Sequence, residues 1–315
     1  MTKARALAIG GYDEWDRAPM AREFALTEIA GPGDLATLDE ATRAAIRIVF
    51  YKSHHPFGGA GMDTLPALGL IANYGVGYDA IDVAAARARG IRVSNTPDVL
   101  TDEVADLALA MLIAHARRMR AAEDWLRAGR WAAEGDFPLT RKATGRRAGI
   151  LGLGRIGRAI AERLAACGSD IHYHARGPKQ TPEGWQAHPD PVSLARAADD
   201  LIVAVPGGAA TAGLVDATVL AALGADGIVV NIARGSVIDE PALLEALERG
   251  TIRGAALDVF ATEPAPDPRF LALDNVLLLP HIGSATRETR QAMGALQRRN
   301  AAAFLAGRDL PTAVA

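Results

Sequence analysis

The sequence predicts an α/β fold made of two doubly wound parallel-sheet domains, of the Rossmann or flavodoxin-like kind, with a cleft between them. Short apolar runs alternate with segments of helical spacing along most of the chain. These runs are apolar throughout, which is typical of strands buried on both faces of a parallel sheet. The length of 315 residues is that of about two domains, each large enough for its own core.

The apolar runs predict strands at residues 6–9, 46–51, 69–72, 91–93, 148–152, 171–173, 201–205, 227–232, 255–259 and 276–279. Helices are expected at 101–120, at 241–249 with Gly250 closing the last turn, and at 285–305. The segment 130–146 is polar and interrupted by Gly and Pro, which indicates a loop or an arm. We place one domain at 97–285 and the other at 1–96 plus 286–315.

Composition narrows the class of protein. The net charge of −3 gives no reason to expect a nucleic-acid partner, which usually needs a strongly basic face. No apolar run of about 18 residues predicts a membrane span, and the N-terminus does not resemble a secretion signal. Cys167 is the single cysteine, so no intrachain disulfide can form. We therefore expect a soluble, cytoplasmic protein without a membrane partner.

A glycine motif follows the strand predicted at 148–152. Gly152, Gly154 and Gly157, with Arg155 and Ile156 among them, form a GxGxxG pattern that opens an amphipathic helix. Such a strand–turn–helix context is typical of dinucleotide binding, because the glycines permit a tight turn and a close approach of the backbone to the pyrophosphate. The alternative is a glycine turn in an unrelated α/β protein.

The next predicted strand indicates the cofactor type. An NAD site would place an acid about 20 residues beyond the glycines, where this chain has Ala175 and then Arg176. Arg176 can pair with a 2′-phosphate, Lys179 can add charge, and His174 can line the adenosine pocket. These features favour NADP, although both cations can also be ordinary solvated loop charges.

Three later strands end in residues suited to oxoacid reduction: Arg234, then Asp258 and Glu263, then His281. Ligands of open α/β sheets gather at the carboxyl ends of the strands. An arginine can hold a carboxylate and polarise the neighbouring ketone, a histidine can protonate the new alkoxide, and a glutamate can orient that histidine. Taken singly, each side chain also suits a structural role, but together they predict an active site.

These segments resemble the D-isomer-specific 2-hydroxyacid dehydrogenase family over nearly the whole chain. The matching segments are 73–82, 93–106, the glycine motif, 231–235, 257–264 and 280–284. Within the family the sequence is most similar to the glyoxylate/hydroxypyruvate reductases and the hydroxyphenylpyruvate reductases. The resemblance implies a two-domain enzyme that forms a homodimer through its cofactor domain.

The resemblance also implies residue roles. Arg234, Glu263 and His281 match the catalytic residues, and Asp258 matches the acid that holds the nicotinamide amide. Val76 and Gly77 fall where backbone amides bind the substrate carboxylate. The remaining matches, which line the cofactor, are Thr101, Val104, Pro206, Thr211 and Ile232. The arm around 125–137 would reach a partner subunit, the alternative being a solvent loop with buried tryptophans.

Substrate size is expected to depend on the first domain, where the signal is weaker. Ser53, His54 and His55 follow a predicted strand and either contact the substrate or are solvated loop residues. Adjacent histidines on an extended chain point apart, so we expect no metal site.

The sequence as a whole predicts an oxidoreductase: an NADP-preferring D-2-hydroxyacid dehydrogenase that reduces small 2-oxoacids such as glyoxylate, hydroxypyruvate or the bulkier phenylpyruvate type. Two alternatives stay open. One is an NAD-linked enzyme that oxidises D-2-hydroxyacids. The other is a non-catalytic scaffold or corepressor-like protein that senses the dinucleotide, since a fold does not by itself define a function.

Overall fold

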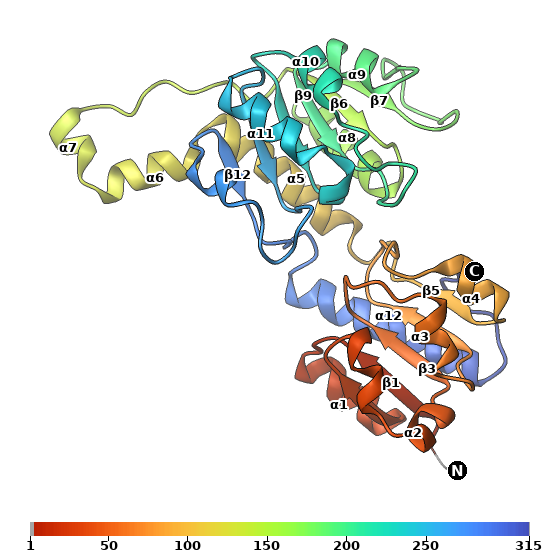
Figure 1. Ribbon diagram of the computed structural model, residues 1–315. Coiled ribbons are helices and arrows are strands. Elements are labelled where there is room, and N and C mark those ends of the chain that lie inside the picture. Colours follow the sequence, from red (N-terminus) through yellow and green to blue (C-terminus); the bar gives the residue numbers. More distant parts are fainter. Residues whose placement is uncertain (1–2, 315) are drawn as a thin grey trace. The chain divides into compact units, whose positions relative to one another are not determined.

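The computed structural model describes residues 3–314, which divide into two compact units (Figure 1). Unit 1 consists of residues 1–100 and 286–315, and unit 2 of residues 101–285. Both are built on parallel sheets with helices on the two faces, so the expectation of two doubly wound α/β domains is confirmed. Among the described residues, no helix is both long enough and apolar enough to cross a membrane.

Unit 1 contains a five-stranded sheet in the order β2-β1-β3-β4-β5. The strands are β1 (Arg5–Ile9), β2 (Ala25–Ile29), β3 (Ile48–Tyr51), β4 (Leu70–Asn73) and β5 (Arg92–Ser94), and all neighbours pair in parallel. Because parallel strands share one carboxyl edge, the loops that follow β3 and β4 lie beside each other. Those loops carry Ser53 and the pair Val76 and Gly77.

Helices cover both faces of the unit 1 sheet. The helices are α1 (Glu14–Glu23), α2 (Glu40–Ala45), α3 (Gly59–Asp63), α4 (Val83–Ala88) and α12 (Arg287–Leu305), with a 3-10 turn, η1 (Pro32–Thr37). Met20 of α1 and Ala301 of α12 pack on one face, whereas Met62 of α3 and Ala86 of α4 pack on the other. Alternate side chains of each strand therefore enter two separate cores, which explains the continuous apolar runs.

Unit 2 contains a seven-stranded parallel sheet in the order β12-β11-β10-β9-β6-β7-β8. Its strands are β6 (Arg147–Leu151), β7 (Asp170–His174), β8 (Gln186–Ala187), β9 (Asp200–Val203), β10 (Ile228–Asn231), β11 (Gly254–Leu257) and β12 (Val276–Leu278). From β6 the chain builds outward through β7 and β8, and then returns to add β9 on the other side. This reversal between β6 and β9 is the point where open α/β sheets bind their ligands.

The unit 2 sheet is also covered on both faces. On one face lie α5 (Thr101–Ala116) and α8 (Arg155–Ala166), and on the other lie α9 (Pro191–Ala197), α10 (Ala217–Leu223) and α11 (Glu240–Glu248). Two 3-10 turns, η2 (Gly235–Val237) and η3 (Pro268–Ala272), follow β10 and β11. Both cores are built from fully buried aliphatic side chains, so the sheet is a rigid base for the loops at its edge.

An arm projects from unit 2 between α5 and β6. It contains α6 (Met119–Arg127) and α7 (Arg130–Glu134), which extend away from the sheet before the chain returns (Figure 1). On its return, Arg141 lies 2.9 Å from Asp200, which is buried and also lies 3.2 Å from Arg146. Burial raises the pKa of Asp200 to about 6 despite these two arginines. The ion pairs anchor the end of the arm to the amino end of β9.

Several elements differ from the sequence-based expectations. The helix expected at 101–120 ends at Ala116, and Arg118 adopts a left-handed conformation with φ of 48° before α6 begins. The segment expected as a loop at 130–146 contains the short helix α7. The strands β2 and β8 were not predicted: β2 is half-exposed and β8 has two residues, so neither has a long apolar run.

Candidate active site

The candidate catalytic side chains follow three neighbouring strands of unit 2. Arg234 follows β10, Asp258 and Glu263 follow β11, and His281 follows β12. These strands are paired in register, so their carboxyl ends lie side by side. The sheet order therefore brings together residues that are far apart in the sequence.

The arginine turn is shaped by Asn231, the last residue of β10. Its Nδ2 donates to the carbonyl of Arg234 at 3.0 Å, and its Oδ1 accepts from the amide of Ala233 at 3.0 Å. Asn231 is buried, so these bonds bend the chain as soon as the strand ends. The side-chain amide of Asn231 thus holds the turn that places the half-buried Arg234 at the sheet edge. The sequence analysis did not assign this role to Asn231.

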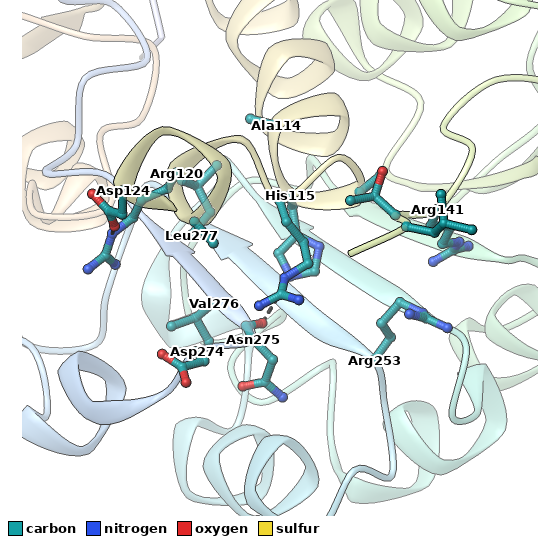
Figure 2. A pocket seen from close by; sticks show the side chains of 15 residues that line it. Ala114, His115, Arg120, Asp124, Arg141, Arg253, Asp274, Asn275, Val276 and Leu277 are labelled. Atoms are coloured by element: carbon teal, nitrogen blue, oxygen red, sulfur yellow. Dashed lines mark hydrogen bonds and ion pairs between the residues drawn. The ribbon is translucent and has the colours of Figure 1, made fainter. Parts of the chain in front are cut away.

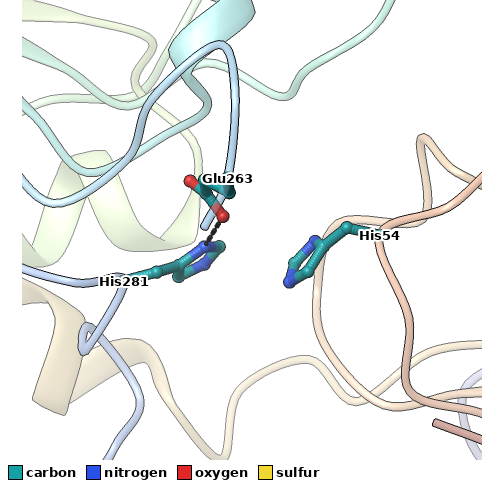
Figure 3. A group of neighbouring side chains, drawn as sticks. All are labelled: His54, Glu263 and His281. Carbon is teal, nitrogen blue, oxygen red and sulfur yellow. Dashed lines mark hydrogen bonds and ion pairs between the residues drawn. The ribbon is translucent and has the colours of Figure 1, made fainter. Parts of the chain in front are cut away.

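Glu263 and His281 form a hydrogen-bonded pair (Figure 3). Oε2 of Glu263 lies 2.8 Å from Nδ1 of His281, and Oε1 accepts from the amide of Phe260 at 3.0 Å. Because a carboxylate only accepts, Nδ1 of the imidazole donates in this pair. Nε2 is then the ring nitrogen suited to exchange a proton with a substrate.

Asp258 has a structural role at the histidine turn. Its Oδ1 accepts from the amide of Ile282 at 2.7 Å, and its Oδ2 accepts from the amide of Gly283 at 2.8 Å. The amide of His281 donates to the carbonyl of Asp258 at 2.8 Å, and His281 adopts a φ of 53°. Burial raises the pKa of Asp258, whereas the two amides oppose that shift. The carboxylate thus stabilises the left-handed turn that carries the histidine.

The glycine turn after β6 has the geometry that a dinucleotide needs. Gly152 has a φ of +102°, and a Cβ there would lie 2.8 Å from backbone atoms of Ala204. A Cβ on Gly157 would lie 1.9 Å from the carbonyl oxygen of Gly152, so strand and helix pack in direct contact. At Gly154 no described atom lies within 4 Å of a Cβ position, which leaves space above the start of α8. A pyrophosphate fits that space, because first-turn amides have no acceptor within the helix.

The strand β7 ends without an acid. Nδ1 of His174 donates to the carbonyl of His188 at 2.9 Å, which joins the end of β7 to the residue after β8. Arg176 and Lys179 lie in the exposed loop between these strands and form no ion pair with another described residue. Two cations at this position are complementary to a phosphate on the adenosine ribose.

This loop is held against α8 by Arg158, which the sequence analysis did not single out. Its guanidinium donates to the carbonyl of Gln180 and lies 5.9 Å from the centre of the Trp185 ring. A single residue of α8, which directly follows the glycine motif, thereby contacts the loop at two places.

The other residues expected along the cofactor belong to unit 2 as well. Thr101 begins α5, and Val104 lies within 3.4 Å of a Cβ built on Gly283, so the start of this helix packs beside the histidine turn. Thr211 closes the loop after β9, with Oγ1 donating to the carbonyl of Pro206 at 2.6 Å. Ile232 directly follows β10 and is half-buried.

In unit 1, two asparagine side chains shape the turn after β4. Nδ2 of Asn73 donates to the carbonyls of Gly75 at 3.1 Å and Gly77 at 2.9 Å, and Asn95 donates to the carbonyl of Val76 at 2.9 Å. Side-chain amides thus bind three successive carbonyls. Within residues 3–314, the amides of Val76 and Gly77 donate to no protein acceptor. These amides are available for an anionic ligand.

The loop after β3 is organised internally. Oγ of Ser53 accepts from the amide of His55 at 3.2 Å, and the hydroxyl of Tyr51 donates to the carbonyl of His55. Burial raises the pKa of that tyrosine. Ser53 therefore shapes its own loop, and His54 and His55 are exposed on it.

Comparison with known proteins identifies the class. Residues 109–283 match the family model of the D-isomer specific 2-hydroxyacid dehydrogenase NAD-binding domain. The chain therefore belongs to the D-isomer-specific 2-hydroxyacid dehydrogenase family, as the sequence motifs indicated.

Individual relatives narrow the resemblance. The chain is 41% identical to glyoxylate/hydroxypyruvate reductase A of Arabidopsis thaliana over 94% of both chains. It is 42% identical to hydroxyphenylpyruvate reductase of Plectranthus scutellarioides over 86% of both. The chain also resembles a crystal structure of the NADPH-dependent glyoxylate/hydroxypyruvate reductase of Sinorhizobium meliloti, which was solved in complex with NADP and malonate. The two superpose with a TM-score of 0.95 at 44% sequence identity, over 100% of this chain and 97% of that one. The relatives are oxidoreductases that reduce 2-oxoacids, and this resemblance supports the same class of reaction for this chain.

Proposed function

We propose that this protein is an NADPH-dependent reductase that converts small 2-oxoacids to D-2-hydroxyacids, with His281 as the general acid. The observation that carries the proposal is the 2.8 Å contact between Glu263 Oε2 and His281 Nδ1. It lies at the sheet edge where Arg234 is delivered by the neighbouring strand. Carboxylate, imidazole and guanidinium are the groups that reduction of an oxoacid requires.

Each residue has a defined part in the reaction. Arg234 pairs with the substrate carboxylate and polarises the adjacent ketone. Bound NADPH supplies the hydride that adds to the keto carbon. Nε2 of the protonated His281 gives its proton to the keto oxygen, which becomes the hydroxyl of the product. Glu263 holds the imidazole through Nδ1 and stabilises its cationic form before the proton is transferred.

The proposed cofactor site follows the reversal of the unit 2 sheet. The amides of the glycine turn receive the pyrophosphate, and Arg176 with Lys179 receives the 2′-phosphate. The absence of an acid at the end of β7 and the NADP bound to the Sinorhizobium meliloti relative support NADP over NAD. The proposed contacts are with Thr101, Val104, Arg155, Ile156, His174, Pro206, Thr211, Ile232 and Asp258.

The proposed substrate is a small 2-oxoacid. The relatives' names point to glyoxylate, hydroxypyruvate and hydroxyphenylpyruvate, and the relative from Sinorhizobium meliloti binds malonate, a small carboxylate. In this chain the amides of Val76 and Gly77 offer a second carboxylate contact, and Ser53 lies on the adjacent loop. Glyoxylate and hydroxypyruvate are the substrates that we expect to be reduced best.

A spectrophotometric assay tests this function. Oxidation of NADPH and NADH is followed with glyoxylate, hydroxypyruvate and hydroxyphenylpyruvate, for the wild type and His281→Ala. We expect turnover with NADPH, and we expect kcat to fall by roughly two to four orders of magnitude in His281→Ala. The affinity for NADPH, measured by fluorescence, should be unchanged in this variant. Tight NADPH binding without turnover on any oxoacid would instead favour a dinucleotide-sensing scaffold.

We also propose that the protein is a cytoplasmic homodimer formed through unit 2 and its arm. The arm exposes four large apolar side chains, each with between 56% and 101% of its area accessible to solvent: Met119, Leu126, Trp131 and Leu139. A group of exposed apolar side chains is typical of a surface that binds another protein. A groove at the base of the arm is lined by residues of α5, of α6, of the returning chain and of the segment that leads into β12, including His115, Arg120, Leu139, Arg141 and Asn275 (Figure 2). A second copy of the arm is the occupant we propose for it.

The oligomeric state can be measured by light scattering after size-exclusion chromatography. We expect a dimer for the wild type and a monomer for Trp131→Glu combined with Leu139→Glu. As a control, Leu271→Glu changes an exposed leucine of η3, outside the arm, and should leave the dimer intact. A monomeric wild type would mean that the arm is a solvent-exposed loop.

A further inference from the structure

Glu240 contacts the loop that carries Glu263. It is the first residue of α11, and its Oε1 accepts a hydrogen bond from the amide of Ala261 at 2.6 Å. Ala261 stands two residues before Glu263 in the sequence. Neither the reaction proposed above nor the sequence motifs give Glu240 a role.

The same stretch of backbone packs on the arginine turn. A Cβ on Gly235 would lie 1.8 Å from the carbonyl carbon of Phe260 and 2.1 Å from the nitrogen of Ala261. The peptide that joins Phe260 and Ala261 therefore lies directly on the residue after Arg234. Its N–H group is the one that donates to Glu240.

Beyond this peptide most residues of the loop are exposed. An open groove of about 600 Å³ separates residues 261–268 from the start of α11, with Ile238, Glu240 and Leu244 among its lining residues. Oγ1 of Thr262 donates to the carbonyl of Ala265, within the loop itself. A loop beside an open groove depends on its end contacts for its position, and the contact with Glu240 is at one end.

The charge around Glu240 is consistent with a held carboxylate. Burial raises its pKa first, and the nearby carboxylates of Asp267 and Glu263 raise it further, whereas the amide of Ala261 lowers it. The carboxylates of Asp258 and Glu263 both lie near His281. A half-buried carboxylate near two others is electrostatically costly, and the hydrogen bond that Glu240 accepts from the Ala261 amide offsets part of this cost.

We propose that Glu240 is a positioning residue: by holding the Ala261 amide it fixes the loop so that Glu263 reaches Nδ1 of His281. This inference rests on the proposed function for its kinetic consequences. Loss of the contact lets the Glu263 carboxylate move away from the imidazole. A displacement of about 1 Å in such a pair lowers turnover by up to roughly a hundredfold.

Two substitutions separate the hydrogen bond from the charge. Glu240→Gln keeps an oxygen that can accept from Ala261 and removes the charge, whereas Glu240→Ala removes both. We expect kcat in Glu240→Ala to fall about tenfold to a hundredfold, with KM for NADPH unchanged, and kcat in Glu240→Gln to stay within about threefold of the wild type.

Asp239→Ala is the matched structural control. Asp239 caps the same helix by accepting from the amide of Ala242 at 3.1 Å, and it is exposed. Its loss should lower the free energy of unfolding, as the loss of a helix cap does, without changing kcat. Equal kinetic losses in Asp239→Ala and Glu240→Ala would overturn the positioning role.

A measurement that is independent of activity distinguishes this inference from the proposed function. The hydrogen bond between Glu263 and His281 can be followed by NMR in the free protein, through the chemical shift of the proton on Nδ1 of His281, with the resonance assigned from His281→Gln. We expect this chemical shift in Glu240→Ala to move toward its value in Glu263→Gln, and to change less in Glu240→Gln. If the wild type reduces no oxoacid but this pattern is observed, the reaction is wrong and the positioning is right. If the chemical shift is the same in Glu240→Ala and Glu240→Gln, the positioning is wrong.

Discussion

Gly283 donates its amide to Oδ2 of Asp258 at 2.8 Å, and the neighbouring amide of Ile282 donates to Oδ1 of the same carboxylate at 2.7 Å. Asp258 is buried, and a Cβ on Gly283 would lie 3.2 Å from that oxygen. The turn that presents His281 is therefore built around one carboxylate. The two amides belong to the residues that directly follow His281, so the carboxylate fixes the backbone from which the imidazole extends.

Substitution of this carboxylate should destabilise the protein and slow the reaction together. In Asp258→Asn one oxygen becomes an NH2 group that faces a backbone amide, which leaves a buried donor without an acceptor and costs about 1–3 kcal/mol. Urea unfolding should show this loss, and kcat should fall because the His281 turn relaxes. Asp216→Asn is the control, since Asp216 also binds two amides but at the start of α10. Unchanged stability in Asp258→Asn would show that the turn does not need the carboxylate.

Removal of the charge on Glu263 should slow the reaction. Glu263→Gln keeps an oxygen near Nδ1 of His281, which lies 2.8 Å from the carboxylate, but it no longer places a negative charge beside the imidazole. We expect kcat/KM with glyoxylate to fall by roughly two orders of magnitude, because the general acid depends on this partner. The measurement is the rate of NADPH oxidation over a range of glyoxylate concentrations. A kcat/KM equal to that of the wild type would contradict the pairing of these residues in the reaction.

Arg176 should control the choice of cofactor. Arg176→Ala removes a guanidinium that can bind a phosphate bidentately, an interaction worth about 1.5–3 kcal/mol when charged groups are involved. We expect KM for NADPH to rise about tenfold or more, while KM for NADH, which lacks the phosphate, stays the same. NADH thus serves as the internal control. Parallel changes for both cofactors would place the arginine elsewhere than at the 2′-phosphate.

The protein should lose stability in mild acid through a pair of histidines. Nδ1 of His172 lies 2.9 Å from Nε2 of His188, and one nitrogen must donate while the other accepts. Burial, followed by the nearby His188, lowers the pKa of His172 below its usual 6.5. As pH falls below about 6.5, the unfolded chain therefore binds more protons than the folded chain does. The free energy of unfolding, which has its full contribution from this pair above that pH, decreases as a result.

His172→Leu should weaken this dependence. We expect the free energy of unfolding of the wild type to fall more steeply between pH 7 and 5 than that of the variant, as measured from urea midpoints. His55→Leu, which changes an exposed histidine, should keep the wild-type slope. Equal slopes in the wild type and His172→Leu would show that the pair stays neutral throughout this range.

The fold class could be predicted from the sequence because buried parallel strands leave a strong local signal. The strands β3, β9 and β10 are buried along their whole length and consist mainly of apolar residues, and the sheet order follows from connections of helical length. The strand β2, whose residues are partly exposed, has no such run. The break at Arg118 was equally hidden, because a left-handed residue without glycine or proline has no sequence signal.

The candidate site was predictable to a smaller extent. Arg234, Glu263 and His281 could be chosen because their side chains suit the chemistry and each follows a strand. The roles of Asn231 and Glu240 could not, since they depend on hydrogen bonds from a side chain to the backbone, as far as 21 residues away for Glu240 and Ala261. Residue type alone does not reveal which backbone amide a carboxylate will meet.

The order of the strands along the chain separates the residues proposed to select the cofactor from the residues proposed to carry out the chemistry. The glycine turn and the loop with Arg176 belong to β6, β7 and β8, all before residue 188, whereas Arg234, Glu263 and His281 follow β10, β11 and β12. Recombination between relatives near residue 190 would therefore exchange the proposed cofactor preference and leave the proposed chemistry intact. A single exchange of this segment could therefore change which reduced cofactor an enzyme of this family uses.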